Sequence, residues 1–149
     1  MDGRRRWIAV GALAVLALSA CSKSGASAES ASAPPVKVRA VEGTDLHRVA
    51  MSAKAVERLG LETAKVTDAP SSAAGPHAAV IPYAALIYDP SGATWVYTGV
   101  GPHTYQRHAV TVARITGDTV TLAEGPPAGT DVVTVGVAEV YGSEFSSEE

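Results

Sequence analysis

One turn signal constrains the fold of this chain more than any other feature. In Asp89-Pro90-Ser91-Gly92, the proline fixes φ at a value that suits the first central position of a turn, and the glycine can adopt a positive φ at no steric cost. The stretch before the turn, 85–88, is apolar, and the stretch after it, 94–97, is β-branched and aromatic. This pattern predicts a β-hairpin. Three of the eight aromatic residues (two Trp, five Tyr and one Phe) flank the turn: Tyr88, Trp95 and Tyr97.

Short strand patterns with turn signals between them surround the predicted hairpin. Residues 36–41 alternate apolar and charged side chains, which predicts a half-buried strand. Gly117-Asp118 is a two-residue hairpin loop between two further strand patterns. A wide turn at 125–129 precedes a last apolar strand at 131–135. A weaker strand pattern lies at 46–51, and 61–66 is predicted to be a further strand. Short strands at close spacing with one short helix predict a mostly-β fold, a small β-roll, barrel-like domain or sandwich.

The single helix is predicted over residues 53–59. Ser52 can cap its N-terminus, and Gly60 stands just after its last turn, where glycine favours the left-handed conformation. Ala53, Val56 and Leu59 are spaced by three residues, so we expect them to share the face that packs on the sheet. Two turns of helix are not stable alone in water, so this packing is required.

The first twenty residues have the pattern of a lipoprotein signal peptide. Arg4-Arg5-Arg6 precedes a 12-residue apolar run, 7–18, which is shorter than the about 20 residues that a membrane-spanning helix needs. Leu18-Ser19-Ala20-Cys21 then resembles a bacterial lipobox, and Cys21 is the only cysteine. We therefore expect lipid attachment at Cys21, since two or more acyl chains anchor a protein stably. The alternative is a plain secretory signal followed by an incidental cysteine.

The expected mature chain begins at Cys21 and has three parts. Residues 22–35 are rich in Ser, Ala and Gly and are predicted to form a flexible tether, 36–142 form the β domain, and 143–149 form a disordered acidic tail. Removing 1–20 takes away three arginines and one aspartate, so the net charge changes from −3 to −5. A modestly acidic domain argues against nucleic acid as a partner, and it leaves the lipid as the attachment to the membrane.

Two segments resemble the periplasmic adaptor (membrane fusion) proteins of efflux transporters. SAKAVERLGLETAKV, 52–66, is similar to the short helix and glycine that lead into the first strand of these adaptors. The second segment has a Val/Ile-Pro-x-x-Ala start, an Asp-x-x-Gly turn, a Trp-Val-Tyr strand and a Gly-Asp hairpin. It ends on a Gly-x-x-x-Gly-x-x-Val-Val-x-x-Gly finish, made of Gly125, Gly129, Val132, Val133 and Gly136. The resemblance covers residues 46–142.

The resemblance implies a function at the membrane. In the adaptor family the two segments come together as the membrane-proximal domain, which contacts the inner-membrane transporter. Here only residues 67–79 separate them, so the lipoyl domain and helical hairpin that lie between them in the family are absent. Pro126 and Pro127 also replace the Leu-x pair that is usual after the first glycine of the finish. The implied protein is a minimal, lipid-anchored module on the extracytoplasmic face of the cell membrane, accessory to a transporter or permease.

The sequence lacks several common catalytic motifs. There is no G-x-S-x-G, no H-E-x-x-H and no glycine-rich phosphate loop, so we expect neither enzymatic activity nor a cofactor. Metal-ligand spacing is also absent. We therefore expect the four histidines to be surface or partner-facing residues: His47, His77, His103 and His108.

Trp95, Tyr105 and Arg107 are the candidate partner-binding residues. Trp, Tyr and Arg are enriched among the residues that dominate binding energy at interfaces. Trp95 and Tyr97 share one face of a strand, and the alternative is that they pack in the core of a domain with few large side chains. We expect Trp95 to lie in the core, and Tyr105 and Arg107 to lie on the partner surface.

The sequence is compatible with three classes of function. The first is a transporter-associated binding module, the second is a stand-alone lipoprotein that binds a small molecule or a metal, and the third is a structural envelope lipoprotein. A pocket lined by convergent polar groups would favour the second class. An apolar or aromatic patch near the tether would favour the first.

Overall fold

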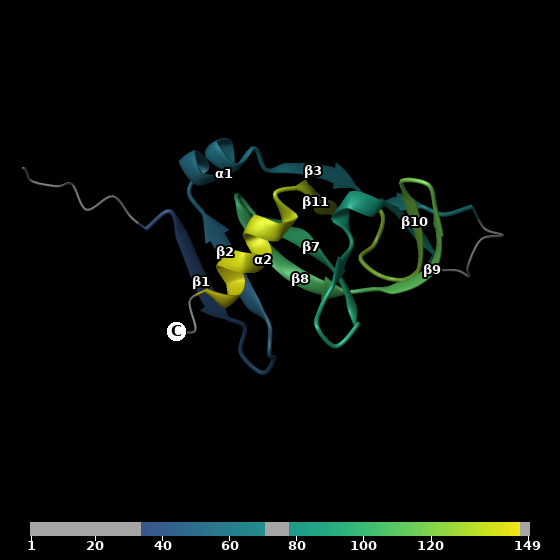
Figure 1. The fold of residues 1–149 in the computed structure, drawn as a ribbon, viewed down its shortest axis with the longest axis horizontal. Coiled ribbons are helices and arrows are strands. Elements are labelled where there is room, and N and C mark those ends of the chain that lie inside the picture. The colour runs from purple at the N-terminus through teal and green to yellow at the C-terminus, as the bar shows by residue number, and fades with distance from the viewer. Residues whose placement is uncertain (1–33, 71–77, 147–149) are drawn as a thin grey trace, which may run out of the picture. The chain divides into compact units, whose positions relative to one another are not determined.

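The computed structural model describes residues 34–70 and 78–146 (Figure 1). The described part is mostly β, with two sheets and short helices, which confirms the predicted fold class. The predicted signal segment, Cys21, the tether up to residue 33, and His77 lie outside the described residues. The elements in chain order are β1 (Val36–Ala40), β2 (His47–Met51), α1 (Ala53–Leu59), β3 (Glu62–Lys65), β4 (Thr67–Asp68), β5 (Ala79–Pro82), the 3-10 turn η1 (Tyr83–Ala85), β6 (Ile87–Tyr88), β7 (Thr94–Gly101), β8 (Thr104–Ala109), β9 (Thr111–Thr116), β10 (Thr119–Glu124), β11 (Asp131–Val135) and α2 (Val137–Phe145).

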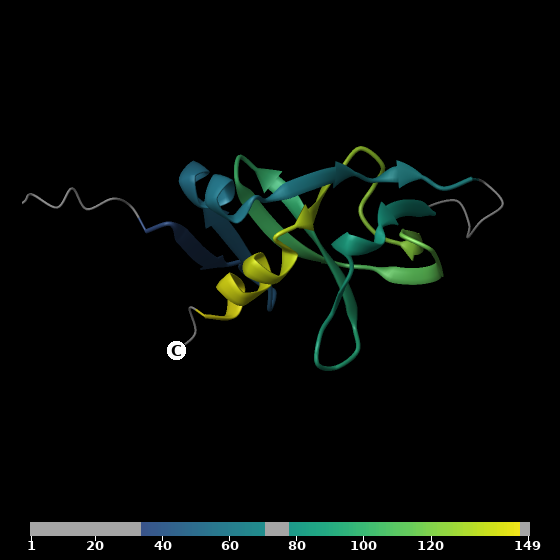
Figure 2. The same ribbon diagram turned by 45° about the horizontal axis from the view of Figure 1, so that its top comes forward.

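The larger sheet joins segments that are distant in sequence. Its strand order is β1-β2-β8-β7-β11-β3, with β6 also paired to β7, and the smaller sheet has the order β4-β5-β10-β9. Strand β2 pairs with β8, and β3 pairs with β11, both antiparallel. The N-terminal strands are thus built into the same sheet as the central hairpin. Figures 1 and 2 show β9 and β10 at one end of the domain, and β1, β2 and α1 at the other.

The two faces of the larger sheet are buried in different cores. Side chains alternate between the faces of a strand, so neighbours on β7 and β11 belong to separate clusters. Val96 and Val132 pack with the apolar residues of the smaller sheet, whereas Tyr97 and Val133 pack beneath the helices, with Val140. Both faces of β7 therefore carry core residues. This explains why the stretch around the predicted hairpin is so apolar.

The predicted hairpin is present between β6 and β7. Ile87 lies opposite Trp95, and Tyr88 lies opposite Thr94. Gly92 has φ 86°, which a residue with a Cβ atom rarely adopts, so the turn depends on glycine there. The Asp89 carboxylate accepts hydrogen bonds from the backbone N–H groups of Ser91 (2.8 Å) and Ala93 (2.9 Å), and these hold the turn closed.

Helix α1 begins and ends as predicted, but its buried face is different. Ser52 Oγ accepts a hydrogen bond from the N–H of Ala55 at 3.2 Å, and Gly60 is left-handed with φ 61°. The prediction that Ala53, Val56 and Leu59 share the buried face is wrong. Ala55 is the buried residue and Val56 is half-buried, whereas Ala53 and Leu59 are exposed, because the helix joins the core cluster through Ala55 and Val56.

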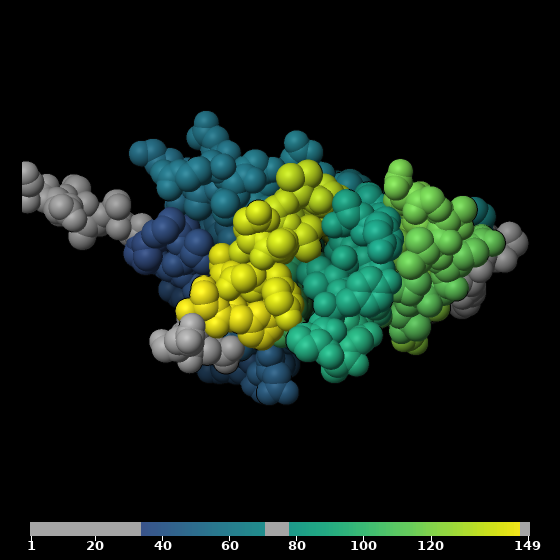
Figure 3. Space-filling view, in the orientation of Figure 1, coloured from purple at the N-terminus to yellow at the C-terminus, as the bar shows by residue number. Residues whose placement is uncertain are grey.

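The C-terminal end of the domain is a helix, so the prediction of a disordered tail from residue 143 is wrong for the described residues. Gly136 (φ 82°) ends β11 and turns the chain into α2, whose last helical residue is Phe145. Val140 and Glu144, one helical turn apart, are both fully buried against the larger sheet. In the space-filling view α2 lies on the surface, with β1 and α1 on one side and the region of η1 and β6 on the other (Figure 3).

Candidate functional site

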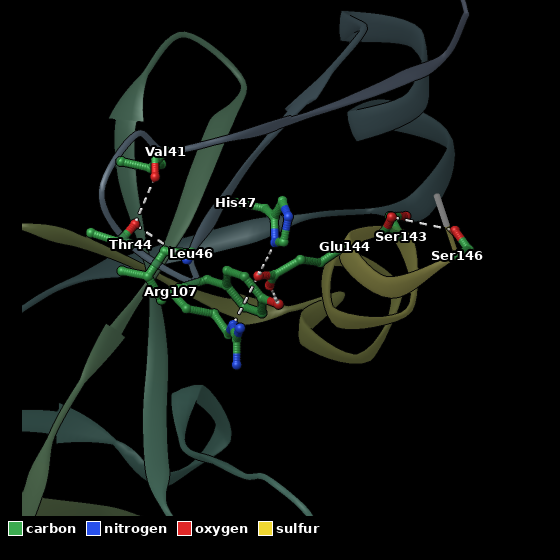
Figure 4. Close-up of polar contacts among 9 residues, drawn as sticks. Val41, Thr44, Leu46, His47, Arg107, Ser143, Glu144 and Ser146 are labelled. Carbon is green, nitrogen blue, oxygen red and sulfur yellow. Dashed lines mark hydrogen bonds and ion pairs between the residues drawn. The ribbon is translucent and has the colours of Figure 1, made fainter. Parts of the chain in front are cut away.

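The polar centre of the domain is a buried carboxylate on α2. The side chain of Glu144 has no exposed surface, and it receives hydrogen bonds from the hydroxyl of Tyr97 on β7 and from Nε of Arg107 on β8 at 2.9 Å. Figure 4 shows Arg107 and His47 directed toward this carboxylate. Nδ1 of His47 on β2 lies 3.6 Å from the same carboxylate. One helix and three strands thus meet at a single charged group.

Arg107 is enclosed by aromatic rings as well as by its ion pair. Its guanidinium carbon lies 4.9 Å from the ring centre of Trp95 and 4.9 Å from that of Phe145. Rings at this distance attract a cation through their negative faces. Phe145 follows Glu144 on α2, so the end of that helix supplies both the carboxylate and one of the two rings.

Glu144, Tyr97, Arg107 and His47 form a buried cluster, which fixes the position of α2 on the sheet. A buried ion pair contributes little net stability compared with apolar packing, but the loss of one partner leaves an uncompensated buried charge. Burial, together with the hydrogen bond to Glu144, raises the pKa of Tyr97 far above its ordinary range, so this hydroxyl keeps its proton and remains a donor. The geometry therefore favours a structural role for this cluster.

The three predicted partner-binding residues have different positions in the structure. Tyr105 is 6% exposed and Arg107 is 8% exposed, so the expectation that they form a partner surface is wrong. Burial also raises the pKa of Tyr105. Trp95 is half-buried at the edge of the core, between Arg107 and the hairpin turn. The partner of Arg107 is on α2, a helix that the sequence analysis does not predict. Arg107 was therefore expected at the surface.

The hairpin turn and the cluster are connected through Trp95. Its indole N–H donates to the Asp89 carboxylate at 3.0 Å, and the Ser91 hydroxyl donates to the same carboxylate at 2.6 Å. The hydrogen bond from Ser91, then that from Trp95, lowers the pKa of Asp89 from the ordinary value of 3.8 to about 2. The charged carboxylate is thus part of the folded hairpin.

This geometry predicts how the hairpin responds to acid. Because the pKa of Asp89 is lowered in the folded chain, the stabilisation by its charged form is fully present above pH 3.8 and is lost as the pH falls towards about 2. In an NMR titration we expect the Asp89 carboxyl signal to have its midpoint near pH 2, and the Trp95 indole N–H signal to shift with it. A midpoint at the ordinary value would contradict this assignment, and Asp89→Asn should remove both transitions.

An apolar groove lies between α2, α1 and the start of β1. Its volume is about 480 Å³. Its mostly apolar lining includes Pro35, Val36, Ala55, Leu59 and Gly142. Two charged side chains, Arg58 from α1 and Glu139 from α2, also line it. Concave surfaces of this volume with a mostly apolar lining are places where another molecule can bind. Pro35 is the last residue of the predicted tether, 22–35, and Val36 directly follows it.

The described part has further hollows besides this groove, and two of them lie next to residues of interest. One, of about 430 Å³, lies between β6 and α2 and is lined by residues that include Tyr88, Val137 and Tyr141. The other, of about 560 Å³, is more polar. Its lining includes Thr44, Asp45, Trp95, Gln106, Arg107 and His108.

The described histidines do not come together. His47 lies beside Glu144, His103 lies in the turn between β7 and β8 with φ 50°, and His108 is exposed on β8. Across residues 34–70 and 78–146, no three His, Cys, Asp or Glu side chains are close enough to share a metal ion. In the same ranges, no helix has the length and apolar character needed to cross a membrane.

Comparisons with protein-family models, with curated proteins and with solved structures found no match to this chain.

Proposed function

We propose that this protein is a lipid-anchored, extracytoplasmic module that binds an integral membrane transporter and has no catalytic role. The observation that carries the proposal is the pairing of the two segments that resemble the adaptors. Strand β2 pairs with β8, and β3 pairs with β11, so residues 47–65 and 79–135 form a single domain. In the adaptor family the corresponding segments form the domain that contacts the transporter.

The short connection between the two segments also supports this function. In the adaptors this position holds the parts that extend towards an outer channel. Here β4 and β5 pair directly with each other, and β5 then joins β10. What corresponds to the adaptor is therefore its transporter-facing part, and the proposed activity is docking at the membrane.

The position of the apolar groove supports docking near the bilayer. Pro35 and Val36 line the groove, and the predicted tether from Cys21 ends at Pro35. An apolar patch near the tether is the feature expected of a transporter-associated module.

A second candidate function is a stand-alone lipoprotein that binds a small molecule. It is favoured by the hollow beside Trp95, where the polar side chains of Asp45, Gln106 and His108 contribute to the lining of a volume of about 560 Å³. Polar groups around a concavity of this size are typical of ligand sites. This candidate predicts a stoichiometric ligand in the purified protein.

The lipid anchor is tested by Cys21→Ser. This change removes the thiol to which the lipid would be attached, so we expect loss of palmitate incorporation and accumulation of a precursor that retains residues 1–20. Metabolic labelling and the intact mass of the protein measure both effects, with Ser24→Ala as the control. An unlabelled wild-type protein, or normal processing of the variant, would contradict the anchor.

The partner is tested by crosslinking in native membranes. Lys37, Lys54 and Lys65 are exposed on β1, α1 and β3, so a lysine-reactive reagent samples several sides of the domain. We expect crosslinked peptides from an integral membrane transporter. Crosslinks to other copies of the chain alone would contradict the proposed function.

A further inference from the structure

We propose that the groove between α1, α2 and the start of β1 binds the apolar face of an amphipathic helical segment of the membrane partner, at the bilayer surface. This inference rests on the proposed function and adds the place of contact and the chemistry of what binds there. Apolar grooves bounded by helices commonly bind an amphipathic helix through side chains spaced by three or four residues.

The composition of the groove determines which kind of segment fits. Leu59 is 37% exposed, and its side chain lines the groove together with Ala55 and Val36. The charged groups of the lining have opposite signs, Arg58 on α1 and Glu139 on α2. A segment with an apolar face and polar residues of both signs matches this arrangement, and the two charges can set its direction.

The groove lies where the folded domain begins, next to the segment that leads to Cys21. Residues 22–33 and Pro34 connect the expected lipid site to Pro35, which itself lines the groove. A tether over these Ser/Ala-rich residues, as predicted from the sequence, would have a root-mean-square span of about 20 Å. With lipid attached at Cys21, that span would keep the groove close to the headgroups, where amphipathic segments of membrane proteins lie.

Gly142 keeps the groove open at a position where the fold does not require glycine. It lies inside α2, where glycine is less favourable than every residue except proline. A Cβ atom built on Gly142 meets no other atom within 4 Å. The domain thus has room for a larger side chain at this position, and the open space belongs to the groove.

The test fills the groove without damaging the fold. Gly142→Leu should raise the melting temperature by about 4 °C, because leucine favours the helix, and should reduce crosslinking at the groove at least tenfold, the scale of a binding hot spot. The readout is a photo-crosslinking amino acid at Ser143, in the full lipoprotein in its native membrane, with crosslinked peptides identified by mass spectrometry. Ala138→Leu is the control, since Ala138 is exposed on α2 and lines the separate hollow beside Tyr88.

The possible outcomes distinguish the proposed contact at the groove from the proposed function of binding a transporter. Crosslinks from Ser143 to an extracytoplasmic amphipathic segment of a transporter, lost in Gly142→Leu and kept in Ala138→Leu, support the proposal. Crosslinks from Ser143 to lipid only, to a second copy of this chain, or to no protein overturn the groove. If the lysine-reactive reagent still crosslinks the protein to a transporter, the proposed function stands and only the groove contact is wrong. If it does not, the proposed function and the groove contact are both wrong. Loss of crosslinking in Ala138→Leu alone overturns the groove in favour of the hollow beside Tyr88.

Discussion

Arg107→Ala is expected to lower the free energy of unfolding by about 3–5 kcal/mol, because it leaves the buried carboxylate of Glu144 without its cation. The pair is well inside the domain, since Arg107 is 8% exposed and Glu144 is fully buried. The substitution also removes the cation between the rings of Trp95 and Phe145. Domains of this size have a total stability of about 5–15 kcal/mol, so the variant should unfold at much lower denaturant concentration.

Denaturant unfolding of the domain measures this effect, and Arg48→Ala is its matched control. Arg48 also donates from Nε to a side chain of the same sheet, Gln106 at 3.0 Å, but it is exposed. Its replacement should therefore cost less than about 0.5 kcal/mol. The triple variant Tyr97→Phe, Arg107→Met and Glu144→Leu should recover most of the loss, because apolar packing can replace a buried ion pair when no buried polar group is left without a partner. Equal effects of the two arginine variants would contradict the buried pair.

Ending the chain after Gly142 is expected to cost at least as much, about 3–5 kcal/mol or more. This truncation removes Glu144 and Phe145 together, which leaves the guanidinium of Arg107 buried without its carboxylate or its second ring. It also removes the last turn of α2, and so short a helix gains its stability from packing. Proteolysis rates and circular dichroism measure the loss of structure.

The control for the truncation keeps the helix and changes only its exposed hydroxyls. Ser143 donates to the carbonyl of Glu139, and Ser146 donates to that of Ser143, both at the surface. The double variant Ser143→Ala with Ser146→Ala should stay within about 0.5 kcal/mol of wild type. A truncated chain that is as stable as wild type would restore the prediction of a tail without a structural role.

The parts of the fold that were predictable have local signals. The hairpin after β6 depends on Pro90 and Gly92, and the limits of α1 depend on Ser52 and Gly60, so neighbouring residues determine both. The buried face of α1 was not predictable in this way. In so short a helix the face depends on where the sheet lies, and the sheet is formed by strands far along the chain.

Helix α2 and its cluster depend on contacts that are distant in sequence. Gly142 and Ser143 are weak helix formers, and a glutamate near the end of a chain resembles a solvated tail. The partners of Glu144 are 37 and 47 residues away, on β8 and β7. The spacing of Val137, Val140, Tyr141 and Glu144 at i, i+3, i+4 and i+7 was the available signal. Without α2, Arg107 could only be placed on the surface.

The buried cluster and the groove are physically connected through α2. Glu144 holds one side of the helix on the sheet, while Gly142 and Glu139 line the groove on another side. A variant that loosens the cluster should therefore also change the groove. For this reason a groove variant that raises stability, such as Gly142→Leu, separates binding from folding.

We propose that the protein acts at the membrane by binding a transporter. Native mass spectrometry of the full chain, extracted from its own membrane in mild detergent, is the decisive experiment for this proposal. We predict a complex with an integral membrane transporter, which releases a lipidated chain carrying no further mass. A lipoprotein that appears without a membrane partner and carries a stoichiometric metal ion or small molecule would contradict the claim.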